Sequence, residues 1–313
     1  MYKIGIDFGG TNLAVGLVDD QNKIVAKTSV PTNREGGIDR IVADMAECCR
    51  DVVAQVGASL ADVSMVGVAS PGAINSTTGT IEYYSGMDVI NYPLADKLRA
   101  AVGVSNVRAE NDANAAALAE AVAGAAEGSQ HSITVALGTG VGGGIIIDGK
   151  VYAGFNYSAA ELGHMVIVHG GLPCSCGRLG CWESYSSATA LIAKTKQAMD
   201  ASPQSKLHAV AAERGAVTGR TAFLAAGQGD SAAQEVVDWY IAHLTTGLAN
   251  IINIFQPQVL CIGVGVGNEG ENLLAPLRKL TMSEQYARTT TERTSIVSAK
   301  LGNDAGIIGA ALL

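Results

Sequence analysis

Charged and aromatic residues are scarce in this sequence. Charged residues make up 16% of the 313 positions and aromatic residues 5%, whereas hydrophobic residues reach 48%. About a quarter of the residues in an average soluble domain are charged. The low share excludes a chain dominated by disordered, highly charged segments and indicates a well-buried globular protein. The length is sufficient for two domains of ordinary size.

Features that would bring the chain to nucleic acid or into a membrane are also missing. There is no basic cluster, and the formal net charge is −8, which argues against a nucleic-acid partner. No run of about 18 apolar residues could span a membrane. The first residues, MYKIGID, enter a strand pattern and lack the charged and apolar segments of a signal peptide. We therefore expect a cytoplasmic protein without a membrane partner.

Cysteine is limited to six residues, and three of them gather in one glycine-rich stretch. His164, Cys174, Cys176 and Cys181 follow the spacing H-x9-C-x-C-x4-C. Zn²⁺ favours four tetrahedral sulfur and nitrogen ligands, and a filled shell leaves no open position for substrate. The alternatives are ordinary thiols, or one disulfide with a spare cysteine, but a disulfide is disfavoured in a cytoplasmic chain. We predict a structural zinc site.

Two carboxylates flank this stretch. Glu161 precedes His164 by three residues, and Glu183 follows Cys181 by two. A metal that fixes the loop would also fix both carboxylates and the second imidazole nitrogen, because metal-bound His usually hydrogen-bonds through its other ring nitrogen. Two acceptors and one N–H donor held together suit a polyhydroxylated ligand. Alternatively, both glutamates are solvated surface charges, as isolated glutamates usually are.

Hydrophobic periodicity predicts a mixed α/β chain. Strands are expected at 3–7, 12–19, 23–30, 63–69, 106–109, 132–137, 145–147 and 259–262, and helices at 38–56, 94–102, 112–126, 231–255 and 304–313. Two strand–glycine turn–strand units, with turns at 8–11 and 138–144, lie about 130 residues apart. This repetition predicts an internal duplication with one copy in each of two domains.

The two glycine turns are candidate phosphate-binding sites. A dinucleotide-binding fingerprint needs its glycines between a strand and a helix, whereas residues 138–144 are followed by strand residues. No G-x-x-x-x-G-K-[ST] sequence occurs. What remains is a pair of turns with exposed N–H groups and the hydroxyls of Thr11 and Thr139. Such turns form anion-binding concavities, and a facing pair would hold a polyphosphate.

The order of the motifs resembles that of ROK-family sugar kinases of the bacterial glucokinase type. They are Asp7-x-Gly9-Gly10-Thr11, Glu110-Asn111-Asp112, Gly138-Thr139-Gly140-Val141-Gly142-Gly143, Glu161-x-Gly163-His164 and the three-cysteine cluster with Glu183. The resemblance extends from residue 3 to the final helix. It implies an actin-like (ribonuclease-H-like) sugar-kinase fold, which is a duplicated, two-domain α/β fold with a central cleft. Domains at 1–109 plus 302–313 and at 110–301, assembled as a homodimer or homotetramer, are expected.

The resemblance also implies an activity and residue roles. The activity is transfer of the γ-phosphate of ATP, with Mg²⁺, to a hexose, most often glucose. Asp112 would be the general base, although on sequence grounds it could equally be a helix N-cap. The other implied sugar-binding residues are Asn111, Glu161, His164 and Glu183. The implied nucleotide-binding residues are Asp7, toward Mg²⁺, together with Gly9, Gly10, Thr11, Gly138, Thr139 and Gly140, and Gly263-Val264-Gly265 near the adenosine.

Several positions depart from the family pattern. Ala160 stands where the family has Gly, Tyr157 is unusually large, and Ser85-Gly86 replaces an Asn that often contacts the sugar. N-acetylmannosamine, N-acetylglucosamine and fructose are therefore alternative substrates. ROK transcriptional regulators carry an additional N-terminal helix-turn-helix, for which we expect no space because a strand already starts at residue 3. A zinc hydrolase is disfavoured, because it would need an open coordination position and the four expected ligands leave none.

Overall fold

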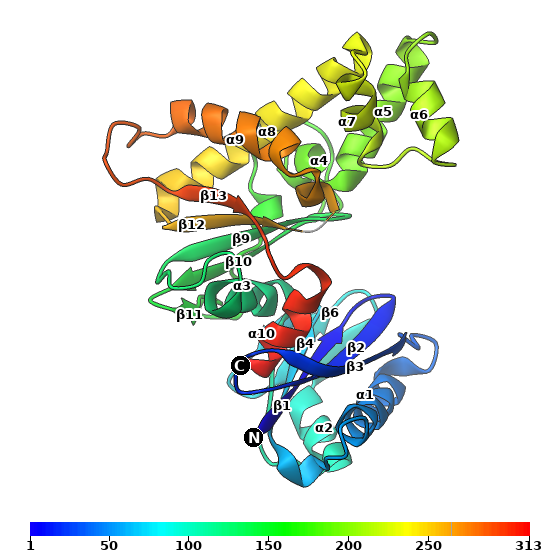
Figure 1. Ribbon diagram of the computed structural model, residues 1–313, viewed down its shortest axis with the longest axis vertical. Coiled ribbons are helices and arrows are strands. Elements are labelled where there is room, and N and C mark those ends of the chain that lie inside the picture. Colours follow the sequence, from blue (N-terminus) through cyan, green and yellow to red (C-terminus); the bar gives the residue numbers. More distant parts are fainter. Residues whose placement is uncertain (264) are drawn as a thin grey trace. The chain divides into compact units, whose positions relative to one another are not determined.

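The computed structural model describes residues 1–263 and 265–313 and consists of two compact units (Figure 1). Unit 1 comprises residues 1–130, 144–160 and 301–313, and unit 2 comprises residues 131–143 and 161–300. Within the described part of the chain, no helix is long and apolar enough to cross a membrane.

Unit 1 contains a five-stranded sheet of order β3-β2-β1-β4-β8. Its strands are β1 (Tyr2–Phe8), β2 (Asn12–Val18), β3 (Ile24–Pro31), β4 (Val63–Ser70) and β8 (Val107–Asn111). Strands β1, β2 and β3 form an antiparallel meander, whereas β4 and β8 continue the sheet in parallel from β1. The strands expected from the sequence are confirmed here to within two residues at each end.

Helices cover both faces of this sheet (Figure 1). On one face, α1 (Gly37–Ala54) and α2 (Leu94–Val102) share a core with alternate residues of β1, such as Ile4 and Ile6. On the other face lies α10 (Ala305–Ala311). A Cβ at Gly5 or Gly67 would lie only 1.8 Å from a carbonyl oxygen of α10. Glycines in the middle of β1 and β4 therefore allow the helix backbone to contact the sheet directly.

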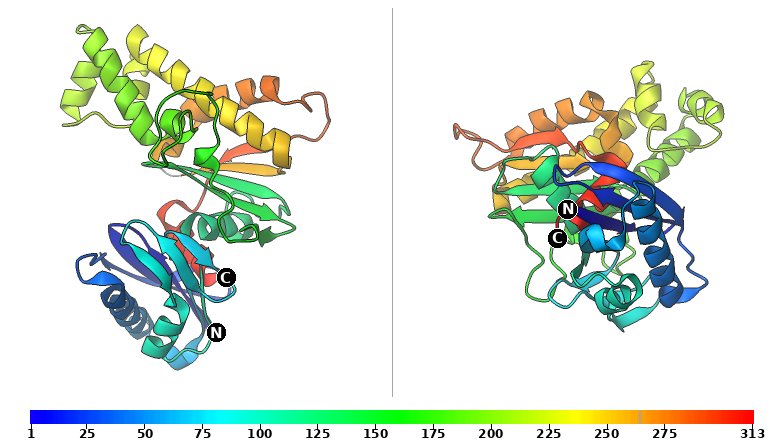
Figure 2. Two further views of the ribbon diagram at one scale, coloured as in Figure 1. Left: turned by 180° about the vertical axis from the view of Figure 1, so that it is seen from behind. Right: turned by 60° about the horizontal axis from the view of Figure 1, so that its bottom comes forward.

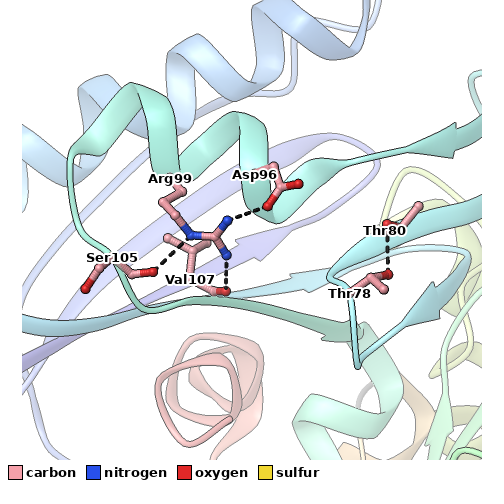
Figure 3. A network of polar contacts seen from close by, with 6 residues as sticks. All are labelled: Thr78, Thr80, Asp96, Arg99, Ser105 and Val107. Carbon is pink, nitrogen blue, oxygen red and sulfur yellow. Dashed lines mark hydrogen bonds and ion pairs between the residues drawn. The ribbon is translucent and has the colours of Figure 1, made fainter.

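A second, small sheet in unit 1 was not predicted. It has the order β5-β6-β7 and consists of β5 (Ala73–Asn75), β6 (Thr80–Tyr84) and β7 (Val89–Tyr92). Nearby, the Arg99 guanidinium near the end of α2 donates to the carbonyl oxygens of Ser105 (2.9 Å) and Val107 (3.5 Å) and pairs with Asp96 (Figure 3). These bonds attach α2 to the start of β8, the strand that leads to Asn111.

The second five-stranded sheet has the order β11-β10-β9-β12-β13, which repeats the arrangement of the first. Its strands are β9 (Ser132–Leu137), β10 (Val141–Ile147), β11 (Lys150–Val151), β12 (Val259–Gly263) and β13 (Ser295–Ser298). In unit 2, β9, β12 and β13 pair in parallel. Two sheets with the same order, each opened by a strand–glycine turn–strand segment, agree with the expected duplication.

Most helices of unit 2 lie on one side of these parallel strands (Figures 1 and 2). They are α4 (Glu183–Ser186), α5 (Ala188–Ala201), α6 (Leu207–Glu213), α7 (Thr221–Gly227), α8 (Ser231–Phe255) and α9 (Glu271–Glu284). Helix α8 has the bounds expected from the sequence. Asp230 caps it by accepting from the Ala233 N–H at 2.8 Å, and it ends at Gln256 in a left-handed conformation, just before Pro257.

The compact units differ from the expected domains in two places. Helix α3 (Asp112–Ala123) belongs to unit 1, because its alanines pack against α10, with Ala115 on Ala310 and Ala119 on Ile308. Residues 144–160 also belong to unit 1, because Ile146 packs against α3. Small side chains on both α3 and α10 bring these helices together, which hydrophobic periodicity alone does not reveal.

Candidate functional site

Asn111 and Asp112 have different structural roles at the start of α3. Asn111 caps the helix, because its Oδ1 accepts from the N–H groups of Ala113 (3.0 Å) and Asn114 (3.2 Å). Its side-chain amide donates to the Gly72 carbonyl at 3.1 Å. Asp112 is the first helical residue, and its Oδ1 accepts from the Ala113 N–H at 2.8 Å. Asp112 is therefore not the N-cap that the sequence left open.

The buried carboxylate of Glu110 hydrogen-bonds residues at the start of α3. Glu110 is 5% exposed, and its Oε1 accepts from the Asn111 N–H at 2.9 Å and from the Asn114 side-chain amide at 3.1 Å. Burial raises the pKa of Glu110, although these hydrogen bonds oppose the shift. Glu110 thus fixes the backbone that carries Asn111 and Asp112.

The negative charge of Asp112 acts on the carboxyl group of Asp7. Burial and the negative charge of Asp112 raise the pKa of Asp7 to about 6, and Lys27 opposes this rise. Two neighbouring carboxylates disfavour a second negative charge unless a cation lies nearby. Carboxylate oxygens are ligands that suit Mg²⁺, so Asp7 fits the magnesium that the family resemblance implies.

The turn after β1 presents backbone next to Asp7. Gly9 donates its N–H to the Asn12 carbonyl at 2.9 Å, while Gly10 and Thr11 are exposed. Thr32 anchors the turn from β3's far end, since its hydroxyl donates to the Gly9 carbonyl (2.7 Å) and its N–H to the Thr11 carbonyl (2.9 Å). Sequence reasoning did not identify Thr32, because no local motif connects it to a turn more than twenty residues away.

The corresponding turn of unit 2 contacts Glu183. Glu183 Oε2 accepts from the Val141 N–H at 3.0 Å, and a Cβ at Gly140 would lie 2.2 Å from the same oxygen. Only glycine therefore fits at position 140 while Glu183 keeps this place. The start of α5 holds the turn through the Ala188 N–H, which donates to the Gly138 carbonyl (2.8 Å), and the Thr189 hydroxyl, which donates to the Thr139 carbonyl (2.8 Å). Thr189 was also not identified from the sequence.

The four expected zinc ligands converge in unit 2. One ligand atom from each of His164, Cys174, Cys176 and Cys181 lies within 4.8 Å of all the others. Cys176 Sγ and Cys181 Sγ are 3.7 Å apart, and Cys174 Sγ is 3.5 Å from His164 Nδ1. Tetrahedral Zn²⁺ with Zn–S of about 2.3 Å and Zn–N of about 2.0–2.1 Å requires separations of about 3.8 and 3.5 Å. The cluster therefore fits a zinc ion.

The thiols of this cluster differ in acidity. Burial raises the pKa of Cys174, but hydrogen bonds from Cys176 and His164 outweigh burial and lower it to about 6. Burial and the neighbouring thiols raise the pKa of Cys181 to about 12. A set of thiols that resists full deprotonation by itself is suited to a cation whose charge stabilises all the thiolates.

Glu161 and Glu183 lie on either side of the zinc cluster in sequence, and each contacts a residue of it. The Glu161 carbonyl oxygen accepts from the His164 N–H at 3.1 Å. Glu183 Oε1 lies 4.0 Å from Cys174 Sγ and 3.5 Å from the Ser175 hydroxyl. Glu161 is exposed and precedes the short helix Leu162–His164. Because His164 directs Nδ1 at Cys174, its Nε2 lies on the opposite edge of the ring. All three residues belong to unit 2, and the side chains of Glu183 and His164 both lie beside Cys174.

Ala160, the residue before Glu161, has a backbone conformation that suits the glycine expected at this position. Ala160 has φ +69° and Tyr157 has φ +60°, which are left-handed conformations that favour glycine. The family's Gly at position 160 therefore fits the backbone better than Ala, which costs about 1 kcal/mol or more in this conformation. Tyr157 is anchored in unit 1 by a hydrogen bond between its hydroxyl and that of Thr77 at 2.9 Å.

The glycines expected near the adenosine are only partly explained. Gly263 ends β12, and Gly265 has φ +46° with a would-be Cβ 2.5 Å from the Leu137 carbonyl. Gly265 is thus required by the backbone, whereas Val264, between them, lies outside the described residues.

Comparison with known proteins decides the family. A model of the ROK family matches residues 3–313. The chain belongs to the ROK family. It is 34% identical to a glucokinase of Halalkalibacterium halodurans over 310 residues, which cover 98% of this chain and 93% of that protein. A glucokinase of Streptomyces coelicolor is 36% identical over 317 residues, which cover 98% and 96% respectively.

A solved structure extends this likeness to the fold. The crystal structure of a ROK family glucokinase from Streptomyces griseus in complex with glucose and AMPPNP has a TM-score of 0.82 to this chain. The two are 35% identical, and the match covers 99% of this chain and 98% of that one. The duplicated two-domain α/β sugar-kinase fold expected from the sequence is thus confirmed.

Proposed function

We propose that this ROK protein is an ATP-dependent hexose kinase that phosphorylates glucose to glucose 6-phosphate. The observation that carries the proposal is the family match over residues 3–313, in which Asp112 begins α3 directly after its cap Asn111. The charge of Asp112 acts on Asp7, which precedes the exposed turn at Gly10 and Thr11. Relatives named glucokinase at 34–36% identity support glucose in particular.

In the proposed reaction, Asp112 is the general base. It accepts the proton of a glucose hydroxyl while that oxygen attacks the γ-phosphorus of ATP. The bond between the γ-phosphorus and the β–γ bridging oxygen breaks, and ADP leaves. Phosphoryl transfer depends chiefly on positioning and on neutralising charge. Mg²⁺ bound with the nucleotide would supply positive charge, and Asp7 is the residue that we assign to face it.

The remaining roles are assigned to the residues that the motifs contain. For the sugar, Asn111, Glu161, His164 and Glu183 would bind hydroxyl groups. For the nucleotide, the backbone of Gly9, Gly10, Thr11, Gly138, Thr139 and Gly140 would bind phosphates, with Gly263 and Gly265 near the adenosine. The exposed N–H groups of such turns suit anionic oxygens.

The zinc ion that His164, Cys174, Cys176 and Cys181 would hold has a structural role in this proposal. Four protein ligands leave it no position for a substrate oxygen. Its contribution is to fix the loop that carries His164 and neighbours Glu183. We also propose that the protein acts in the cytoplasm, where ATP is available, as a homodimer or homotetramer, which analytical ultracentrifugation would establish.

A panel of sugars with Mg²⁺-ATP tests the substrate. Glucose, fructose, N-acetylglucosamine and N-acetylmannosamine are compared by kcat/KM for ADP formation. The proposal expects glucose to give the highest value. Preference for an N-acetylhexosamine or fructose would keep the kinase but replace its substrate, whereas ADP formation independent of every sugar would contradict the proposed function.

A further inference from the structure

The C-terminal helix α10 passes very close to the carboxylate of Asp7. Gly306 is the second residue of α10, and a Cβ at this position would lie 2.5 Å from Asp7 Cγ. The same Cβ would lie 2.6 and 2.9 Å from the two carboxylate oxygens. Non-bonded carbon atoms are normally about 3.5–4.0 Å apart. A side chain at position 306 therefore requires the Asp7 carboxylate to move.

Three other glycines, at the contacts of α10 with its neighbouring elements, face backbone atoms and not a side chain. A Cβ at Gly5, Gly67 or Gly309 would lie 1.8 Å from a backbone carbonyl oxygen. Those glycines allow backbone to pack on backbone, so their replacement affects the fold. At Gly306 all three nearest atoms belong to the end of one short side chain. This side chain can swing away while the fold persists.

A second contact ties the same segment to the surroundings of Asp7. Lys27 on β3 forms an ion pair with Asp304, two residues before Gly306. The positive charge of Lys27 also acts on Asp7 and opposes the rise of its pKa. The start of α10 thus contacts Asp7 directly at Gly306, and Asp304, just before the helix, pairs with the lysine whose charge acts on Asp7.

We propose that Gly306 is a positioning residue. Because it has no side chain, the Asp7 carboxylate can occupy the position that it needs in the reaction. This inference rests on the proposed kinase function. A displaced carboxylate would no longer be aligned toward the Mg²⁺ of the nucleotide. Misplacement of a reacting group by about 1 Å can reduce a rate about 100-fold. Glucose binding should largely persist, because three of the four assigned sugar-binding residues, Glu161, His164 and Glu183, belong to unit 2.

Kinetics of Gly306→Ala separate positioning from simple loss of packing. We expect kcat to fall about 10–100-fold, the Mg²⁺ concentration for half-maximal rate to rise, and the KM for glucose to change less than about threefold. Ile308→Val is the matched control, because Ile308 lies on the same helix and packs against Ala119 and Ala305, away from Asp7. The inference is wrong if Gly306→Ala keeps the wild-type kcat and Mg²⁺ dependence, or if Ile308→Val changes both equally.

A double-mutant cycle on thermal stability tests the contact without using activity. Gly306→Ala should lower Tm by about 2–4 °C or more when Asp7 is present, and by clearly less in an Asp7→Ala background, where the clashing carboxylate is absent. If Gly306→Ala fails to fold, recovery of folding in the double variant supports the inference. Equal destabilisation in both backgrounds would overturn it. If the wild-type protein shows no glucose-dependent ADP release, the kinase proposal is refuted. The cycle would still show whether a side chain at position 306 clashes with Asp7, because it measures thermal stability alone.

Discussion

At the scale of single residues, Asn111 and Asp112 show why the sequence left a choice open. Asp and Asn are equally good N-caps, so the pattern Glu110-Asn111-Asp112 does not tell which side chain closes the helix. In the structure Asn111 does, with Glu110 buried behind it. Asp112 does not cap the helix and is its first residue. The expectation that Asp112 is the base remains a prediction, and its replacement tests it.

Asp112→Asn keeps an oxygen that can accept from the Ala113 N–H but removes the negative charge and the proton acceptor. We predict that kcat falls about 10²–10⁴-fold, the usual contribution of a general base. Glucose affinity, measured by calorimetry, and Tm should change little. Asp230→Asn, at the start of α8, is the control and should keep wild-type turnover. Turnover of Asp112→Asn within a few-fold of wild type would show that the base lies elsewhere.

Glu161 and Glu183 should govern sugar binding rather than nucleotide binding. Glu161→Gln and Glu183→Gln each weaken an acceptor, and a site built to bind hydroxyl groups is sensitive to unpaired polar atoms. We predict that the KM for glucose rises about tenfold or more in each variant, while the KM for ATP changes much less. Glu271→Gln on α9, whose carboxylate pairs with Arg278 at the surface, is the control. An effect on the KM for ATP alone would contradict the assignment.

The raised pKa of Asp7 predicts a pH dependence of the Mg²⁺ requirement. Its carboxyl group has a pKa of about 6, above the ordinary value for Asp, so it takes up a proton as pH falls through 6. The protonated form is a poor Mg²⁺ ligand. One pH unit below this pKa, the half-saturating Mg²⁺ concentration should be about tenfold higher. Steady-state rates at pH 5 and 7.5 measure it, and an Asp7→Asn enzyme should show no such change.

At the scale of structural elements, the zinc loop was the feature best defined by sequence. The spacing of His164 and the three cysteines was sufficient to predict that their side chains converge, because short loops rich in glycine leave few other arrangements. What spacing could not supply is the support around them. Tyr185 accepts from the Leu172 N–H at 2.7 Å and stacks on His243 of α8 at 4.7 Å. These contacts depend on folding between distant segments.

Removal of the metal should therefore act through the loop. We predict about one zinc per chain in protein purified without added metal. Chelation, or Cys181→Ser, should raise the KM for glucose, because His164 and the surroundings of Glu183 lose their support. Cys48→Ser is the control, since Cys48 is buried in unit 1, and it should retain the zinc. Elemental analysis measures the zinc content, and calorimetry measures glucose binding. An active enzyme with much less than one equivalent of zinc would refute the prediction.

The strands of the small sheet in unit 1 and helices such as α5 and α9 were not predicted from the sequence. Strands β5, β6 and β7 have three to five residues, and their backbone includes left-handed residues: Asp88 in the turn before β7 and Asn91 within β7. Such short segments carry too few residues for a period to be recognised. Helices α8 and α2 were predicted with their bounds, whereas α5 and α9, with 14 residues each, were not. For the helices, burial matters more than length: α5 buries only Leu191 and Thr195, so its sequence shows little periodicity, whereas α8 buries a continuous face.

At the scale of the whole molecule, the duplication was predictable and the division into units was not. Two strand–glycine turn–strand segments indicated a repeated fold, and two sheets of the same order agree with it. The expected boundary at residue 109 instead lies within unit 1, because α3 packs on α10 through alanines and Gly309. Contacts between segments almost 200 residues apart leave no local pattern, so they require the structure.

The most direct test of the central claim follows both products of the proposed reaction in one vessel. Purified protein, Mg²⁺-ATP and glucose are incubated, and ADP and glucose 6-phosphate are quantified over time. We predict that the two form in equal amounts, at a rate that saturates with glucose, and that Asp112→Asn reduces both about 10²–10⁴-fold. ADP release that does not depend on glucose, or that occurs without glucose 6-phosphate, would contradict the account.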